Sequence, residues 1–175
     1  MAVRPKETIL TGTSRRNQSL LTDEEVLARL PELWKALDEF NDGYWFESHE
    51  TLEELWFVSP WPVRQFFQGI IQAAAAFVHL ARREREGTLK LLPLAIAKLE
   101  PFAPEHLGID VGRLVADLRR ARDDIASLPA EALDGYRERA PRIAFERVVP
   151  STGHRDDLTP AARADARPQQ RSDCS

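Results

Sequence analysis

Residues 40–58 read FNDGYWFESHETLEELWFV, and this stretch decides the fold. It opens with Asn41-Asp42-Gly43, a turn of the kind that ends a helix, since glycine is the usual residue just past a helix C-terminus. The segment that follows, Tyr44–Val58, has apolar residues at helical spacing, and one stripe of its helical wheel carries Trp45, His49, Leu52 and Trp56. The stretch therefore predicts two helices joined by a tight turn.

The remainder of the chain continues this helical pattern. A capping box, Thr22-Asp-Glu-Glu25, predicts the start of the first helix, and Asp110 is expected to cap a later one. Pro60 and Pro62 must separate two helices, because proline lacks a backbone donor and restricts the residue before it. Helices are expected over about 31–41, 44–58, 62–86, 88–100 with a kink or restart at Pro93, and 111–128, with one more within 129–140.

The predicted fold class is all-α, a compact single-domain helical bundle with a long central helix over residues 62–86. No strand-like alternation of useful length interrupts it. A length of 175 residues suits one domain, which we place at residues 20–150. Residues 1–19 and 151–175 contain few large apolar side chains and are expected to be mobile tails.

Charge and composition exclude several classes of protein. Residues 20–150 hold 16 basic and 23 acidic residues, and such an acidic domain is a poor partner for nucleic acid. The single cysteine, Cys174, excludes an intrachain disulfide and a cysteine metal cage. The start of the chain has no apolar segment of the length a signal peptide needs, and no long uncharged run is free of glutamine or histidine. We therefore expect a cytoplasmic protein with no membrane partner.

Two neighbouring helices carry polar residues on otherwise apolar surfaces. On the first, Glu53 lies one turn after His49 and can reach it. On the second, Gln68, Gln72 and His79 fall within a narrow sector of an apolar helix. A short proline-containing turn makes these helices antiparallel neighbours, so we expect a single buried polar cluster between them.

The cluster supports two interpretations. His49, Glu53 and His79 could be ligands of a divalent metal, with Glu50 as a general base, in a site with hydrolase-like potential. The same residues could instead form a hydrogen-bonded network with Gln72 that fixes helix register, without any chemistry. Acid–base catalysis without a metal is a third, weaker possibility.

The stretch quoted above also resembles a known family. Together with Phe67-Gln68-Gly69-Ile70-Ile71-Gln72 and His79, it is similar to the bacterial helical proteins classed as domain of unknown function 309, over about residues 32–128. The resemblance implies an all-helical, compact bundle and no particular activity. Its motif positions in this chain are Gly43, Glu47, His49, Glu50, Glu53, Trp56, Gln68, Gln72 and His79.

The function predicted first is that of a structural or interaction module, in which a protein partner binds elsewhere, through the acidic surface. A homo-oligomer is also possible because many large aromatic residues need cover. The tryptophans Trp34, Trp45, Trp56 and Trp61 are expected to pack in the core. His106 and His154 are expected to be exposed and inert.

Overall fold

Six α-helices, three short 3₁₀ helices and one small hairpin make up the part of the chain that the structure describes, residues 20–148 of a computed structural model. The α-helices are α1 (Asp23–Ala28), α2 (Leu30–Asn41), α3 (Trp45–Val58), α4 (Val63–Ala81), α5 (Arg85–Leu99) and α6 (Val111–Ser127). The hairpin pairs β1 (Glu105–His106) with β2 (Ile109–Asp110), and the 3₁₀ helices are η2 (Glu100–Phe102), η3 (Ala130–Ala132) and η4 (Asp134–Arg139). The all-α bundle is confirmed, and both predicted tails lie outside the described residues.

Local sequence signals set several helix ends. The Thr22 hydroxyl accepts from the Glu25 backbone amide while the Glu25 carboxylate accepts from the Thr22 amide, so the predicted capping box is present. The Asp110 carboxylate caps α6 by accepting from the Arg113 amide. Gly43 has a φ of +81°, which a residue with a side chain adopts only at a cost, and α2 ends just before it.

The central helix is shorter than predicted. It ends at Ala81, because the chain turns at Arg83, which has a left-handed φ of +62°. The next helix, α5, then begins three residues before the expected start and continues through Pro93 without a restart. Pro93 lies on the exposed side of α5, so its ring does not disturb the opposite side, which packs against α4. Tertiary packing thus outweighs the hydrogen bond that proline removes.

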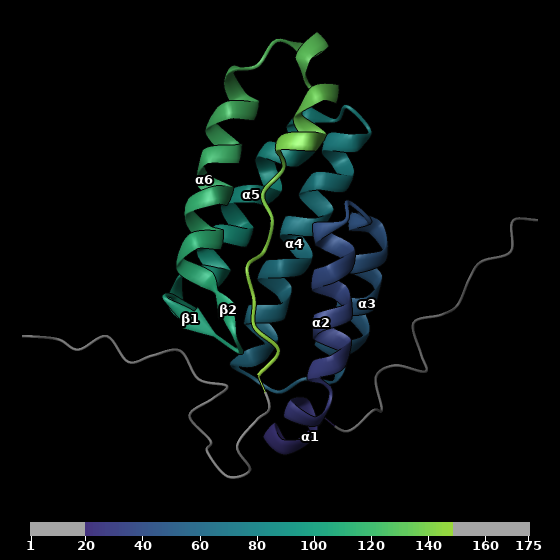
Figure 1. The fold of residues 1–175 in the computed structure, drawn as a ribbon, viewed down its shortest axis with the longest axis vertical. Coiled ribbons are helices and arrows are strands. Elements are labelled where there is room, and N and C mark those ends of the chain that lie inside the picture. The colour runs from purple at the N-terminus through teal and green to yellow at the C-terminus, as the bar shows by residue number, and fades with distance from the viewer. Residues whose placement is uncertain (1–19, 149–175) are drawn as a thin grey trace, which may run out of the picture.

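The core is built around α4, which contacts α3 and α5 as antiparallel neighbours (Figure 1). Phe77 of α4 lies edge-on to Phe40 of α2, with ring centroids 5.8 Å apart, and 5.4 Å from the ring of Trp45 on α3. All three rings are buried, so they join α2, α3 and α4 at one point. No helix among residues 20–148 is long and apolar enough to cross a membrane.

An extended segment, residues 140–148, closes the bundle, and we call it the C-terminal strap. In Figure 1 it runs down the front of the bundle between α6 and α2. The side chain of Asn41 binds both backbone groups of Ile143 in the strap. The Asn41 side-chain amide donates to the Ile143 carbonyl at 2.9 Å, and the Asn41 side-chain oxygen accepts from the Ile143 backbone amide at 2.6 Å. Further along, Phe145 forms a single isolated β-bridge with Ile109, so the strap lies beside the hairpin.

His106 is buried, which corrects the expectation that it is exposed. The His106 ring lies against the rings of Phe66 and Phe102, with ring centroids 4.7 and 4.8 Å away, respectively. Burial lowers the pKa of His106 from 6.5 to about 4, because the charged imidazolium loses its hydration there. His154 lies outside the described residues. The expectation that Trp61 packs in the core is also wrong, because Trp61 is 70% exposed, whereas Trp45 is buried.

A pH dependence of stability follows from the buried His106. Between pH 6.5 and pH 4 the unfolded chain binds a proton at this residue that the folded chain does not, so stability falls as the pH is lowered through that range. From pH 7.5 to pH 5 we expect His106 to account for a loss of about 2 kcal/mol in the free energy of unfolding. Urea titrations at the two pH values measure this loss.

The matched control is His106→Leu, which removes the titrating group and keeps an apolar side chain. Its two free energies of unfolding should differ by about 2 kcal/mol less than those of the parent protein. Only the difference between pH values is compared, so a change in absolute stability does not obscure the result. An equal pH dependence in parent and variant would contradict the prediction.

Candidate functional site

The residues singled out in the sequence lie along the α3–α4 pair, and two contacts fix the register of these helices. The ring of Trp45 lies against Phe77, and the Arg64 guanidinium sits 4.6 Å from the ring centroid of Trp56. The N-terminal end of α3 is therefore level with residue 77 of α4, and the C-terminal end with residue 64. By interpolation His49 is level with Gln72, whereas His79 lies beyond the start of α3.

His49 is paired within its own helix. Its Nε2 atom lies 3.7 Å from a carboxylate oxygen of Glu53, one turn on, and its ring stacks on Phe46. The imidazole is 27% exposed, so it is half-buried rather than sealed in the core. Its other nitrogen, Nδ1, is buried and has no hydrogen-bond partner among residues 20–148. Glu50, the predicted general base, is exposed.

His79 belongs to a different contact. Its Nδ1 atom pairs with the carboxylate of Glu84, in the turn between α4 and α5, and its side chain is 37% exposed. The ring packs so closely on Gly87 that a Cβ atom there would lie 2.6 Å from Nδ1. A side chain at position 87 would therefore displace the histidine.

The three predicted metal ligands thus lie in two separate contacts: His49 pairs with Glu53, and His79 pairs with Glu84. A difference of about seven residues along α4 separates the levels of His49 and His79, which corresponds to about 10 Å of helix. Within residues 20–148, no group of three or more histidine, cysteine, aspartate or glutamate side chains could hold a metal ion. Metal binding by His49, Glu53 and His79 stays a prediction that rests on their spacing in the sequence.

Gln68 and Gln72 are half-buried on α4. The side-chain oxygen of Gln72 is buried without a hydrogen-bond partner in the described part of the chain, at the level of the unpartnered Nδ1 of His49. No hydrogen bond between α3 and α4 joins these glutamines to His49 or Glu53 within residues 20–148. The arrangement is therefore an open polar stripe and not the closed hydrogen-bonded network that the sequence suggested.

Among residues 20–148, this stripe is a side of α4 that neighbouring helices leave partly uncovered. Half-buried side chains run along it at helical spacing, while most residues on the remaining circumference are buried; the stripe consists of Arg64, Gln68, Gln72, Ala75 and His79. It is flanked by α3 on one side and α5 on the other. We call the stripe and its two flanks the motif face.

Each flank of the motif face presents an exposed apolar side chain. Phe46 on α3 and Leu94 on α5 are both 49% exposed. Leu94 lies on the same side of α5 as Gly87, two turns before it, and Lys98, one turn after it. Gly87 lies against His79 of α4, and Lys98 lies against Gly69 of α4. The motif face is therefore a shallow polar strip with an apolar group on either side.

The two flanks carry opposite charge. On α3, Glu47 and Glu50 are exposed and form no ion pair among residues 20–148, and this helix contains no basic residue. On α5, Lys90 and Lys98 likewise have no acidic partner in the described ranges. Sequence reasoning described the domain as acidic overall and missed the basic α5 flank. The signal for it was the run Leu89-Lys90-Leu91-Leu92, whose leucines occupy more than one side of a helix.

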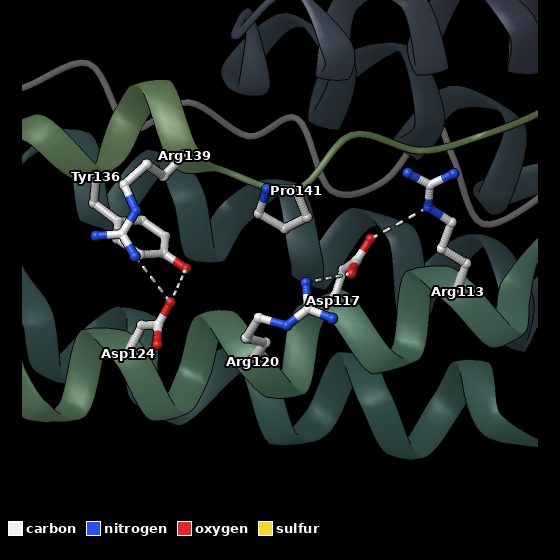
Figure 2. Close-up of a pocket in the computed structure, with 7 residues that line it drawn as sticks. All are labelled: Arg113, Asp117, Arg120, Asp124, Tyr136, Arg139 and Pro141. Atoms are coloured by element: carbon white, nitrogen blue, oxygen red, sulfur yellow. Dashed lines mark hydrogen bonds and ion pairs between the residues drawn. The ribbon is translucent and has the colours of Figure 1, made fainter.

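A cavity of about 340 Å³ lies on the opposite part of the molecule, between α6, η4 and the strap (Figure 2). Its three arginines and two aspartates form ion pairs with one another. Asp117 pairs with Arg120 at 3.1 Å and with Arg113 at 3.7 Å, while Asp124 accepts from the Tyr136 hydroxyl at 3.3 Å. Burial and the neighbouring Asp124 raise the pKa of Tyr136 to about 12. The contacts of Asp124 with Tyr136 and Arg139 attach η4 to α6, whereas the ion pairs of Asp117 lie within α6.

Comparison with known proteins gives a family for the first half of the bundle. The chain is similar to the uncharacterized protein YpuF of Bacillus subtilis (strain 168), with 35% identity over 89 residues, which is 49% of this chain and 51% of YpuF. The chain thus spans about half the length of the curated relative it matches. The family model of a domain of unknown function, DUF309, matches residues 33–91, a shorter range than the 32–128 expected from the resemblance. Residues 33–91, which form most of α2, all of α3 and α4 and the first half of α5, are therefore similar to the DUF309 family.

Proposed function

We propose that this protein is an interaction module and that the motif face is the surface to which a protein partner binds. The observation that carries the proposal is the placement of the motif residues. Within residues 20–148, His49, Glu53, Gln68 and Gln72 gather along the partly uncovered side of the central helix.

The chemistry of the motif face suits a protein partner. Exposed apolar side chains at Phe46 and Leu94 give a docking helix something to bury, and the polar strip between them offers hydrogen-bonding groups. The buried Nδ1 of His49 and the buried side-chain oxygen of Gln72 lack partners within residues 20–148. A partner that supplies a donor and an acceptor at this level would satisfy both atoms.

Site-specific photocrosslinking in cells tests the proposal. A photoreactive phenylalanine analogue at position 46 is expected to give one discrete crosslinked product. The same analogue at Ala126, an exposed residue of α6, is the matched control and should give none. The second substitution Leu94→Glu, across the face from the probe, should abolish the product without changing the melting temperature, since Leu94 is an exposed residue.

Two results would overturn the proposal. Equal labelling from positions 46 and 126 would mean that the motif face has no preferred partner. A product that survives Leu94→Glu would mean that contact with Phe46 does not involve the rest of the face.

A further inference from the structure

We infer that the cavity between α6, η4 and the strap binds a small anion of the phosphate class, such as a phosphate ester or a diphosphate. We call it the arginine cavity after Arg113, Arg120 and Arg139, three of the residues that line it (Figure 2). Its volume of about 340 Å³ suits a small molecule. The arginine cavity shares no residue with the motif face, so a ligand there is additional to the protein partner proposed above.

The charge of the chain around the arginine cavity differs from that of the preceding helices. Residues 20–110 contain 8 basic and 16 acidic residues, whereas residues 111–148 contain 8 basic and 7 acidic ones. The lining of the cavity follows the second pattern, because its three arginines face only two aspartates, Asp117 and Asp124. An acidic domain thus carries a local excess of positive charge at a cavity, and such an excess raises the local concentration of anions.

Two of the arginines hold their acidic neighbour loosely. Arg113 and Arg120 lie 3.7 and 3.1 Å from the carboxylate of Asp117, and neither side chain donates a hydrogen bond to any residue within 20–148. Arg83, by contrast, donates to the carboxylate of Asp134 through two nitrogen atoms. A guanidinium carries five N–H donors. Arg113 and Arg120 can therefore bind an incoming anion without breaking an internal hydrogen bond.

The third arginine is ordered by its surroundings. The guanidinium of Arg139 lies 5.2 Å from the ring centroid of Tyr136, and it donates to Asp124 at 3.5 Å. Tyr136 is itself buried, and its hydroxyl donates to the same carboxylate. Arg139 is thus partly fixed before a ligand arrives, which reduces the conformational entropy that binding costs.

The directions from which the arginines approach favour a phosphate over a carboxylate. Arg113 and Arg120 reach Asp117 from opposite directions along α6, while Arg139 extends into the cavity from η4 (Figure 2). The terminal oxygens of a phosphate are arranged tetrahedrally and can accept from guanidinium groups that lie on several sides, whereas the two oxygens of a carboxylate share one plane. The bound anion takes the place of Asp117 as the partner of Arg113 and Arg120.

Isothermal titration calorimetry of the full chain with inorganic pyrophosphate, at constant ionic strength, tests the inference. We expect binding at one site, and Arg120→Gln should weaken it at least about tenfold because it removes a charge-assisted contact. Arg119→Gln is the matched control. Arg119 is the adjacent residue of α6 but pairs with Glu100 outside the cavity, so this variant should keep the parent affinity within about twofold.

Asp117→Asn provides a test of opposite sign. It removes the carboxylate that competes with the ligand for Arg113 and Arg120, so pyrophosphate should bind about threefold tighter or better. Because Arg119 and Arg120 are exposed, their glutamine variants should melt at the parent temperature, which shows that they fold.

Four results would overturn the inference. The first is the absence of binding at millimolar pyrophosphate. The second is an equal loss of affinity in Arg119→Gln and Arg120→Gln, which would mean attraction by net charge alone. The third is an Asp117→Asn variant that binds no tighter than the parent. The fourth is citrate binding as tightly as pyrophosphate, because a site built for phosphate should prefer the tetrahedral anion.

Discussion

Replacement of Phe77 by alanine is expected to lower the free energy of unfolding by about 3–5 kcal/mol. Phe77 is fully buried in the middle of α4 and touches the rings of Phe40 and Trp45. The substitution removes apolar surface from the core and leaves a cavity where α2, α3 and α4 meet, and a packed interior relaxes only in part. Chemical denaturation followed by far-UV circular dichroism measures the loss.

Phe46→Ala is the matched control for this experiment, because it makes the same chemical change on the neighbouring helix. The Phe46 ring is half exposed, so its loss should cost well under about 1.5 kcal/mol. Similar losses for the two variants would contradict the described packing around Phe77.

Gly108→Ala is the second substitution with a large expected effect, a loss of about 3 kcal/mol or more. Gly108 has a φ of +78° in the turn of the hairpin, a conformation that strains any residue with a side chain. An added Cβ would also lie 2.4 Å from the carbonyl oxygen of Glu146, and that oxygen belongs to the strap backbone. The strap must therefore move, which breaks the 2.7 Å hydrogen bond from the Glu146 amide to the Gly108 carbonyl.

Hydrogen exchange at the Glu146 amide, read together with the denaturation midpoint, separates this effect from a general loss of structure. In Gly108→Ala, exchange at this amide should become faster and the denaturation midpoint should fall. Gly135→Ala is the control, since a Cβ at Gly135 meets no atom within 4 Å and the φ there is not positive. A Gly108→Ala variant that keeps its parent stability and its slow exchange at Glu146 would disprove the close approach.

The helix boundaries that could be read from the sequence are those that local chemistry sets. The capping box at Thr22, the turn at Gly43 and the cap at Asp110 each act within four residues, so their effect is visible in the sequence alone. The end of α4 was misjudged because a leucine-rich helix followed the turn at Arg83. The start of that helix, α5, depends on packing against α4 rather than on a capping side chain.

The hairpin, the strap and the burial of His106 could not be predicted, because each depends on contacts between distant residues. Two-residue strands carry no usable alternation, and the strap is held by Asn41, an ordinary turn residue in the sequence. The helical wheel of α4, by contrast, places Gln68, Gln72 and His79 on one side of the helix. Only the structure shows that this side is half-buried and that His79 pairs with Glu84.

The double hydrogen bond between Asn41 and Ile143 has a consequence for the order in which the chain folds. It joins residues 102 positions apart, whereas the contacts of α3 with α4 and of α4 with α5 join neighbouring segments. Closing a long loop costs more conformational entropy than forming a helical hairpin, so local hairpins are favoured early and distant contacts late. We therefore expect the side chain of Asn41 to stay solvated through most of folding, until Ile143 of the strap binds it. The strap is the last segment to be added, and during synthesis it leaves the ribosome after the helices that it fastens.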